Sequence, residues 1–404
     1  VAPALRRWLL LARPQGALEQ VAVAGRRDGA IHVDARLVAL GFQPVGRSPG
    51  VQGLAGTLSG DADGFHLRFE PEAPVRFDWP RGFATAHVVR VDGDVSGWRD
   101  GDGWRIATPG LHVDGKDYGA HARGGLWWQG DGSRPWIDLA VAVDDSAVTA
   151  AKGFWMRELM PPAAVRWLDD ALLGGRVQGG RAIVSGDLDD WPFVDAGRFD
   201  ATAHIADATL KYHEGWPAAE KVELDAHFLA DGFDVEGTGE IAGIRIGAMR
   251  GGIDHYRGGR LTVRAEGATD ARQLLALLRA SPLQQMHAET LSNLSVAGPA
   301  RADFNLDMPL REARAFTLGG AVDLTRATAS DARWKLAFDQ VTGRAEYSRS
   351  GLRARDLSVR HDGQPGRLSL RAGDDYVLDR AHVFEAGLDA SLTAAQLVER
   401  APDL

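Results

Sequence analysis

The feature that most constrains the fold of this chain is a two-residue alternation of apolar and polar side chains. It is clear in Phe65–Phe69 (FHLRF), Phe304–Met308 (FNLDM) and Trp334–Phe338 (WKLAF). A period of two places successive side chains on opposite faces of a strand, so that one face is apolar and the other solvated. Polar turns such as GDADG separate these segments, as is typical of hairpins. The pattern therefore predicts antiparallel sheets with one wet face.

A hairpin-like phrase recurs along the chain. It consists of a strand, a polar turn that ends in glycine, and a second strand opened by an aromatic residue or leucine. The phrase occurs in Val51–Phe69, Val91–Val113, Val222–Val235 and Val341–Val359. Repetition of one supersecondary unit indicates a repeat architecture, and glycines inside strands predict bulges and bends. We therefore expect a mostly β fold, an elongated, curved antiparallel β-sheet groove built from repeated hairpins.

Helical periodicity is confined to short segments, which we expect to brace the sheet. The clearest is 162–173, where Pro162 suits the first turn and Gly174 suits the left-handed position past the end. The other expected helices are Pro3–Ala12, 270–279, 281–293 and 393–399. We expect 1–160 to form the first part of the groove with the N-terminal helix, and 161–404 to continue it.

One strand-like segment changes phase along its length. In Phe199–Tyr212 the apolar positions run through Ala201 and Ile205 and then shift by one residue to Ala208 and Leu210. A phase shift of this kind at a bulge would turn part of the apolar set to the other face.

Composition excludes several classes of function. A net charge of −9 over 404 residues argues against nucleic acid as a partner, because phosphate binding requires a concentrated basic surface. The absence of cysteine removes disulfides and thiolate sites. No apolar run is long enough to span a bilayer. Because the chain begins at Val1 without a methionine or a visible signal peptide, we expect it to be a piece of a longer protein.

The candidate motifs for catalysis and metal binding lack the spacing or the flanking elements that these functions require. Gly46–Gly50 (GRSPG) matches a hydrolase nucleophile motif, but Pro49 follows the serine where a helix is required, so we expect a turn. Gly237–Gly243 has the wrong spacing for a dinucleotide fingerprint. The acidic residues around Asp92 and Asp100 lack the spacing of a calcium loop, and the histidines form no pair at helical spacing. The sequence predicts no catalytic residue, no metal site and no cofactor.

Strands with one apolar face outnumber the helices that could cover them. One solution is a sandwich or barrel whose apolar faces cover one another. The other is a bent sheet whose apolar face stays open as a groove. Composition alone favours neither.

A longer pattern resembles the YhdP branch of the AsmA-like proteins of Gram-negative bacteria. It begins with Trp167–Phe193 (WLDDALLGGRVQGGRAIVSGDLDDWPF) and continues with Gly197-x-Phe199, Asp207–Tyr212 (DATLKY) and Gly215–Pro217 (GWP). The segment Trp334–Leu370 also resembles the strand unit that this family repeats. The likeness extends over most of the chain.

The resemblance implies a bridge-like lipid-transfer protein. Members of this family are understood to be anchored in the inner membrane and to cross the periplasm. Their repeating β-groove has an apolar interior that carries phospholipid toward the outer membrane, in outer-membrane biogenesis. This chain lacks the family's N-terminal transmembrane helix, so we expect the inner-membrane anchor in a longer full-length protein, and its protein partners are unknown. The expected function is a segment of a periplasmic lipid-transfer conduit with phospholipid as ligand and no enzymatic activity.

The alternation also selects the side chains expected to line the groove. These are Phe65, Leu67, Phe69, Phe199, Ile205, Leu210, Phe228, Phe233, Val235, Trp334, Leu336, Phe338, Leu368 and Leu370. Ordinary core packing explains each of them equally well, and a bulge would turn part of the set outward.

Two other functions stay open on the sequence. A structural β-repeat scaffold would have a closed core. A carbohydrate-binding β protein would suit the many tryptophans and the Asp-Gly turns, above all if Trp98 and Trp104 were exposed on the same face.

Overall fold

The computed structural model describes residues 3–25, 27, 29–83, 85–158, 160–193, 196–286, 288–333, 335–391 and 394. Contacts within the chain divide it into two compact units. Unit 1 holds Val1–Ala208 and Asp225–Ala230, and unit 2 holds Thr209–Leu224 and Asp231–Leu404. The division of the groove at residue 160, expected from the sequence, stays a prediction.

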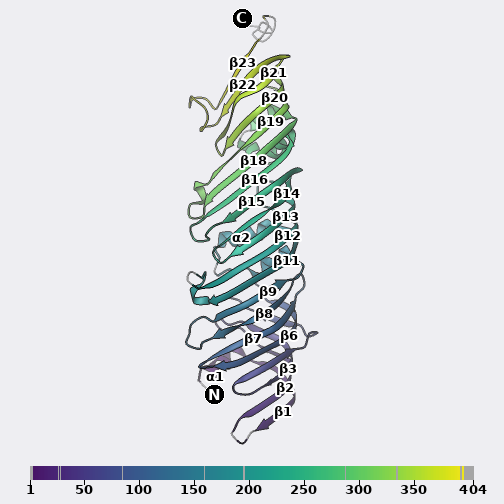
Figure 1. Ribbon diagram of the computed structural model, residues 1–404, viewed down its shortest axis with the longest axis vertical. Coiled ribbons are helices and arrows are strands. Elements are labelled where there is room, and N and C mark those ends of the chain that lie inside the picture. The colour runs from purple at the N-terminus through teal and green to yellow at the C-terminus, as the bar shows by residue number, and fades with distance from the viewer. Residues whose placement is uncertain are drawn as a thin grey trace. The chain divides into compact units, whose positions relative to one another are not determined.

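Strands dominate unit 1 and pair antiparallel in nearly chain order (Figure 1). The ladder begins with β1–β2–β3. Strands β4 and β5 both lie between β3 and β6 and pair with each of them. The ladder then continues as β6–β7–β8–β9–β11, and the short β10 also pairs with β11. The bounds are β1 Gln15–Gly25, β2 Ile31–Phe42, β3 Gly50–Gly60, β4 Gly64–Phe69, β5 Val75–Asp78, β6 His87–Asp100, β7 Gly103–Asp114, β8 Gly119–Trp128, β9 Trp136–Val143, β10 Ser146–Ala147 and β11 Leu172–Asp187.

Unit 2 is a second antiparallel ladder. It runs β14–β15–β16–β18–β19–β20–β21–β22–β23, and the short β17 also pairs with β19. The bounds are β14 Gly232–Ile241, β15 Ile244–Ile253, β16 Arg260–Asp270, β17 Leu294–Ala297, β18 Pro299–Pro309, β19 Thr317–Asp331, β20 Leu336–Ser348, β21 Gly351–His361, β22 Gln364–Ala372 and β23 Phe384–Ala390. Residues of β12 (Gly197–Leu210) and β13 (Ala219–Leu229) fall into both units.

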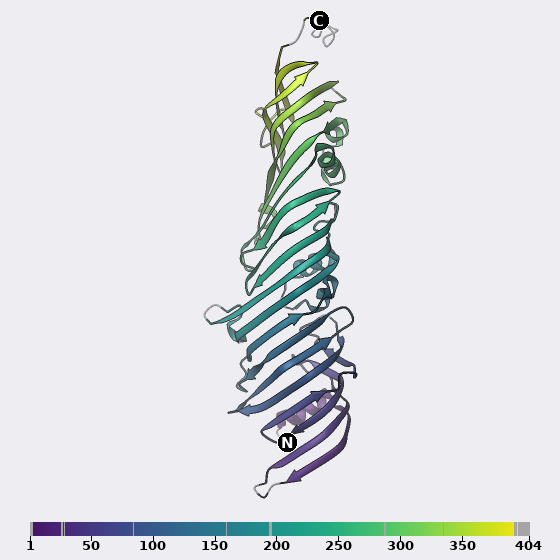
Figure 2. The ribbon, with the colours of Figure 1, turned by 45° about the vertical axis from the view of Figure 1, so that its right-hand side comes forward.

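The helices are short and lie between strands. They are α1 Pro3–Ala12, α2 Pro162–Ala171, α3 Ala271–Arg279, α4 Leu283–Met286 and α5 Ala288–Asn293, with 3-10 turns η1 Val148–Phe154, η2 Leu188–Asp190 and η3 Ala313–Ala315. In unit 2, helices α3 to α5 occupy the connection between β16 and β17, beside the strands of that unit (Figure 2). Asp270 caps α3 by accepting a hydrogen bond from the Arg272 N–H at 2.8 Å. The expected helices at 3–12 and 270–279 are therefore present, while residues 393 and 395–399 lie outside the described part of the chain.

The second helix ends earlier than its sequence predicts. We expected a helix over 162–173 with Gly174 just past its end, and Pro162 does occupy its first turn. The helix nevertheless stops at Ala171, and Leu172 is already extended and begins β11. Pairing of Ala147 with Arg176 draws this segment into the sheet, so that Gly174 lies inside a strand. Sheet pairing has overridden the local helical pattern here.

The mostly β fold class is confirmed, with 62% strand and 12% helix. Three of the four hairpin phrases pair as expected, in β3–β4, β6–β7 and β20–β21. The GRSPG motif is a turn closed by hydrogen bonds between Val45 and Ser48.

Bulges within the strands shift the phase of the sequence pattern and keep the sheet faces continuous. In β2 the pairing passes from Leu37 to Leu40 with one extra residue, and Ala39 adopts a left-handed φ of 49°. The phase shift of the sequence pattern in Phe199–Tyr212 coincides with a φ of 49° at Asp207. A left-handed residue within a strand adds one position without moving the next apolar side chain to the other face.

Gly124 tests how much this irregular backbone depends on glycine. Its φ is 123°, and a Cβ there would lie 2.1 Å from the Asp138 carbonyl oxygen. We expect Gly124→Ala to lower the free energy of unfolding by at least about 1–3 kcal/mol, because strain at such φ values is of that size and the clash adds to it. Urea unfolding followed by tryptophan fluorescence measures the loss.

Gly110, in the bulge of the neighbouring strand, is the matched control. Its added Cβ would meet nothing within 4 Å, so Gly110→Ala should change stability by less than about 0.5 kcal/mol. Equal losses for the two variants would contradict this account.

Candidate functional site

One face of the sheet in unit 1 is apolar from strand to strand. Directly opposite residues of antiparallel strands share a face, so the strand register identifies the side chains of each face. The face carries Val33, Ala35, Leu37, Leu58, Phe65, Leu67, Val91, Val95, Ile106, Leu111, Val113, Ala122, Leu126, Ile137, Leu139, Val141 and Val184. We call this set the apolar face of unit 1.

Much of the apolar face is covered only in part. Leu58, Leu67, Ile106, Leu126 and Leu139 are only partly buried in the structure. In a closed core such aliphatic side chains are mostly inaccessible to water. Contiguous apolar surface of this kind on a folded protein marks a site for an apolar ligand or a partner.

The opposite face of the same strands is polar and carries ion pairs. Arg68 donates to Asp94 across β4 and β6 at 2.8 Å, and the Arg68 guanidinium holds the pKa of the Asp94 carboxyl below its usual range. His66 lies on the same face, 3.3 Å from that carboxylate. Solvent-exposed pairs of this kind add little stability, but they fix which face meets water.

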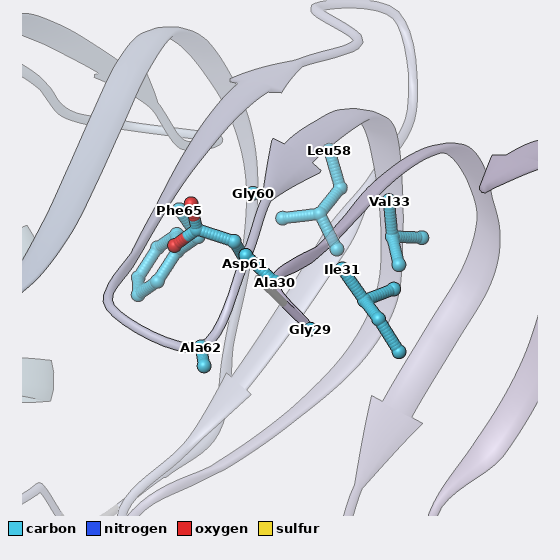
Figure 3. A pocket seen from close by; sticks show the side chains of 9 residues that line it. All are labelled: Gly29, Ala30, Ile31, Val33, Leu58, Gly60, Asp61, Ala62 and Phe65. Carbon is cyan, nitrogen blue, oxygen red and sulfur yellow. The ribbon is translucent and has the colours of Figure 1, made fainter. Parts of the chain in front are cut away.

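A hollow of about 460 Å³ opens on the apolar face between the ends of β1 to β4. Its apolar lining comes from Ile31, Val33, Leu58 and Phe65, and Gly60 leaves space between them (Figure 3). Asp61 stands at the turn, where its carboxylate accepts backbone hydrogen bonds that lower its pKa. The hollow therefore joins apolar walls to an acidic, solvated rim.

An aromatic cluster covers another part of the apolar face. Phe154 of η1 stacks on His87 with ring centroids 4.4 Å apart and contacts Phe83 and Tyr118 edge-on. Burial raises the pKa of Tyr118, whose hydroxyl lies 3.0 Å from His87 Nδ1. Tyr118 also packs beside the buried valines Val75, Val89 and Val91. The helical insertion that follows β10 thus closes this region and leaves the neighbouring strands open.

Unit 2 has an apolar face of the same kind. It carries Phe233, Val235, Ile253, Leu261, Val263, Phe304, Leu306, Met308, Leu318, Val322, Leu324, Phe338, Val341, Leu357, Val359, Leu368, Leu370 and Leu388. The part on β19 to β22 is tightly packed, with Val341 only 1% exposed. The part on β14 to β18 is only partly buried.

Tyr347 and Tyr212 of unit 2 have raised pKa values. Burial raises the pKa of Tyr347, and the charge of Asp303 acts in the same direction; the hydroxyl donates to the Asp303 carbonyl at 2.7 Å. Burial alone raises the pKa of Tyr212 to about 12. Neither group titrates near neutral pH, so both hydroxyls keep their protons there.

Sequence similarity assigns the chain to a protein family. A family model described as YhdP protein matches residues 1–401. The chain belongs to the YhdP family. It is 22% identical over 321 residues to the intermembrane phospholipid transporter YhdP of Escherichia coli strain K12. That alignment covers 78% of this chain and 25% of the relative, so the chain spans about a quarter of the relative's length. No solved structure matches the chain.

Among the described residues of this YhdP-family chain, none of the helices has the length and apolar character needed to cross a membrane.

The expected groove residues of unit 1 do not all have the same surroundings. Phe65, Leu67 and Phe69 lie on the apolar face, and Phe65 lines the hollow. Phe199 packs edge-on against Trp191 at 5.7 Å. Ile205 is partly buried, while the Phe228 side chain is 37% exposed. The assignment of these side chains to lipid contact stays a prediction.

The expected residues of unit 2 divide between open and packed regions. Phe233 and Val235 lie on its partly buried region, and Leu210 is also partly buried. Phe338 and Leu368 belong to the buried cluster, with Leu336 and Leu370 packed against it. Trp334 lies outside the described residues. The sequence reasoning missed Ile106, Leu126 and Leu139, which lie in strands interrupted by small residues that weaken the alternation.

The tryptophans considered for sugar stacking do not share a face. Trp98 pairs with Arg105, whereas Trp104 pairs with Arg99, so the two indoles project from opposite sides of the sheet. Trp104 packs toward Phe65 on the apolar face at 6.3 Å. On the polar face, Trp98 borders a hollow of about 490 Å³, where the Arg105 guanidinium stands 4.5 Å from the Trp127 ring centroid.

Phe338 and Phe304 test the difference between packed and open regions of unit 2. Both are on the apolar face, but Phe338 is 7% exposed within the cluster and Phe304 is only partly buried. We expect Phe338→Ala to cost about 3–5 kcal/mol of stability, because it leaves a cavity. Phe304→Ala should cost less than about 2 kcal/mol, because less apolar surface is withdrawn from water. Urea unfolding of both variants measures the difference, and equal costs would show that the β14 to β18 region is closed.

Proposed function

We propose that this chain is a section of a lipid-transfer conduit in which acyl chains lie against the apolar faces of the two units. The observation that carries the proposal is the partly buried apolar face that passes from strand to strand in each unit. Opposite it is a face lined with ion pairs such as Arg344 with Asp323 at 2.7 Å. A lipid can therefore bury its tails on one face while its head group stays in water.

The energetics favour such a surface. Exposing a methylene to water costs about 0.8 kcal/mol, so a chain of about sixteen carbons costs on the order of 12 kcal/mol. An apolar strand surface removes most of this cost without requiring a directional contact, because the hydrophobic effect is non-directional. Successive strands about 4.8 Å apart offer similar surfaces in turn. A tail can then move from one strand to the next without crossing a high barrier.

The relative supports phospholipid as the ligand and a place between membranes. Its name describes an intermembrane phospholipid transporter, and we infer that this chain acts in the cell envelope, in the periplasm. The chain spans a quarter of that relative, so the proposal concerns one section of a longer path. The inner-membrane anchor and the membrane partners would belong to the remainder.

Transfer of this kind changes no covalent bond and requires no catalytic residue or cofactor. We therefore infer that the chain is not an enzyme. A closed-core scaffold would leave Ile106, Leu126 and Leu139 inaccessible, whereas they are partly exposed. The open face favours the conduit over the scaffold.

Leu139→Asp tests the proposal. Leu139 lies on the apolar face between Gly124 and Val184, and a carboxylate there would place a charge against the acyl chains. We expect wild-type protein, purified from bacterial cells without detergent, to carry phospholipid that native mass spectrometry and lipid extraction detect. The Leu139→Asp protein should retain several-fold less lipid, because an unpaired charge in an apolar contact is unfavourable.

Ala140→Asp is the matched control, because the next residue of the same strand faces the polar side. It should retain lipid at the wild-type level, and circular dichroism should show that both variants keep the β fold. Folded wild-type protein without lipid, or equal lipid loss in both variants, would refute the proposal.

A further inference from the structure

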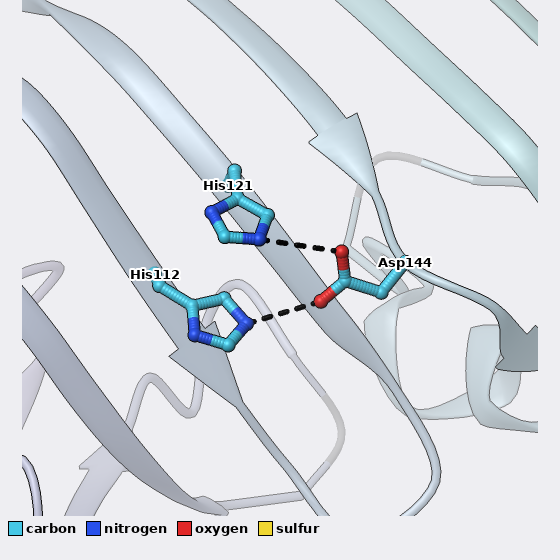
Figure 4. A group of neighbouring side chains, drawn as sticks. All are labelled: His112, His121 and Asp144. Atoms are coloured by element: carbon cyan, nitrogen blue, oxygen red, sulfur yellow. Dashed lines mark hydrogen bonds and ion pairs between the residues drawn. The ribbon is translucent and has the colours of Figure 1, made fainter.

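Two histidines and an aspartate converge on the polar face of unit 1, away from the proposed lipid surface. His112 of β7 and His121 of β8 are direct cross-strand partners, and their rings stack 4.1 Å apart with planes within 9°. Both Nε2 atoms point to the carboxylate of Asp144, one to each oxygen, at 3.0 and 3.5 Å (Figure 4). One nitrogen or oxygen atom from each residue lies within 4.8 Å of the others.

The backbone is arranged so that Asp144 reaches the histidines. Asp144 follows β9, and its N–H donates to the Gly119 carbonyl at 2.9 Å. A Cβ on Gly119 would lie 2.4 Å from Asp144 Oδ2, so the glycine leaves the space that the carboxylate occupies. The buried Ser146 then donates to the Asp144 carbonyl at 2.7 Å. The backbone of Asp144 is therefore held by hydrogen bonds at both its N–H and its carbonyl group.

The geometry points to a site for a divalent transition-metal ion of the zinc type. We propose that His112 Nε2, His121 Nε2 and one oxygen of Asp144 are its three protein ligands. Imidazole and carboxylate are ligands that Zn²⁺ accepts, at bond lengths of about 2.0–2.2 Å. Ligand atoms of a tetrahedral site then lie about 3.3 Å apart, close to the spacings between Asp144 and the two rings. Small rotations of the rings bring both nitrogens onto one ion.

The exposure of the three side chains determines what else the ion can bind. They are 37, 61 and 40% exposed for His112, His121 and Asp144, so solvent reaches the ion and completes its coordination. Asp92 lies in the same cross-strand row, directly opposite His112. A further carboxylate in this row makes the surroundings more favourable for a cation.

A bound ion would fix the position of the segment that follows β9 and leads to η1. Asp144 is followed by β10 and by η1, which carries Phe154 into the aromatic cluster against His87. Linking β7 and β8 to Asp144 holds this segment in register. The ion thus has a structural effect on the covered part of the apolar face while remaining on the opposite side of the sheet.

Zinc titration of the metal-stripped chain tests the site. Competition with a chromophoric chelator should show about one strongly bound Zn²⁺ per chain, and Zn²⁺ should raise the melting temperature because it binds the native state. His121→Asn should weaken binding at least about tenfold, since even partners of metal ligands have effects of that size. The same change should abolish the thermal shift. His112→Asn provides a second variant on the neighbouring strand.

His66→Asn is the matched control. His66 lies on the polar face beside a carboxylate, with Nε2 3.3 Å from Asp94, and its substitution should leave zinc affinity unchanged. Circular dichroism of each variant separates loss of the site from loss of the fold. Wild-type protein that binds no zinc, or equal affinity in the wild type and the folded His121→Asn and His112→Asn variants, would overturn the proposal.

Discussion

The structure depends on apolar side chains that its own chain covers only in part. In an ordinary domain the hydrophobic effect drives such residues into a closed core. Here Val341 and its neighbours form a packed cluster, while Leu58, Ile106 and Leu139 remain partly exposed. The hydrogen bonds of the antiparallel ladders and the packing of neighbouring side chains within one face must hold the exposed region together. A ligand that covers this face would therefore stabilise the folded protein, because it binds the native state.

One face stays apolar over many strands only if the backbone compensates where the apolar–polar alternation of the sequence shifts by one residue. Left-handed residues such as Ala39, Asp207 and Asp356 add one position to a strand, and the apolar set resumes on the same face beyond them. The interruption of the two-residue period at Phe199–Tyr212 is visible in the sequence, but its correction by a left-handed residue is not. The hairpin phrases and the cap of α3 at Asp270 are predictable, since their determinants lie within a few residues.

What the sequence could not provide are the features set by pairing between strands. The end of α2 at Ala171 reflects the pairing of Arg176 with Ala147, which no local pattern contains. Trp98 and Trp104 are close in sequence but project from opposite faces, because the two strands of their hairpin pair Trp98 with Arg105. The cluster of His112, His121 and Asp144 likewise arises from register. The positions of these residues along the sequence do not reveal the cluster, because they are brought together by pairing between strands and not by the spacing of one helix.

The difference between the apolar and the polar face follows from the pleated geometry of the strands. Successive side chains of a strand alternate between the two faces, so Leu139 can be selected for contact with an apolar ligand while Ala140 is selected for contact with water. The polar face consequently carries ion pairs such as Arg68 with Asp94, and the histidines that we propose as metal ligands, without placing charge on the apolar face. A closed barrel would also separate two faces, but its interior would have to open before a lipid head group could remain in water. In the proposed conduit, a partly covered face meets both requirements at once, because lipid tails can lie on the strands while the head group stays in solvent.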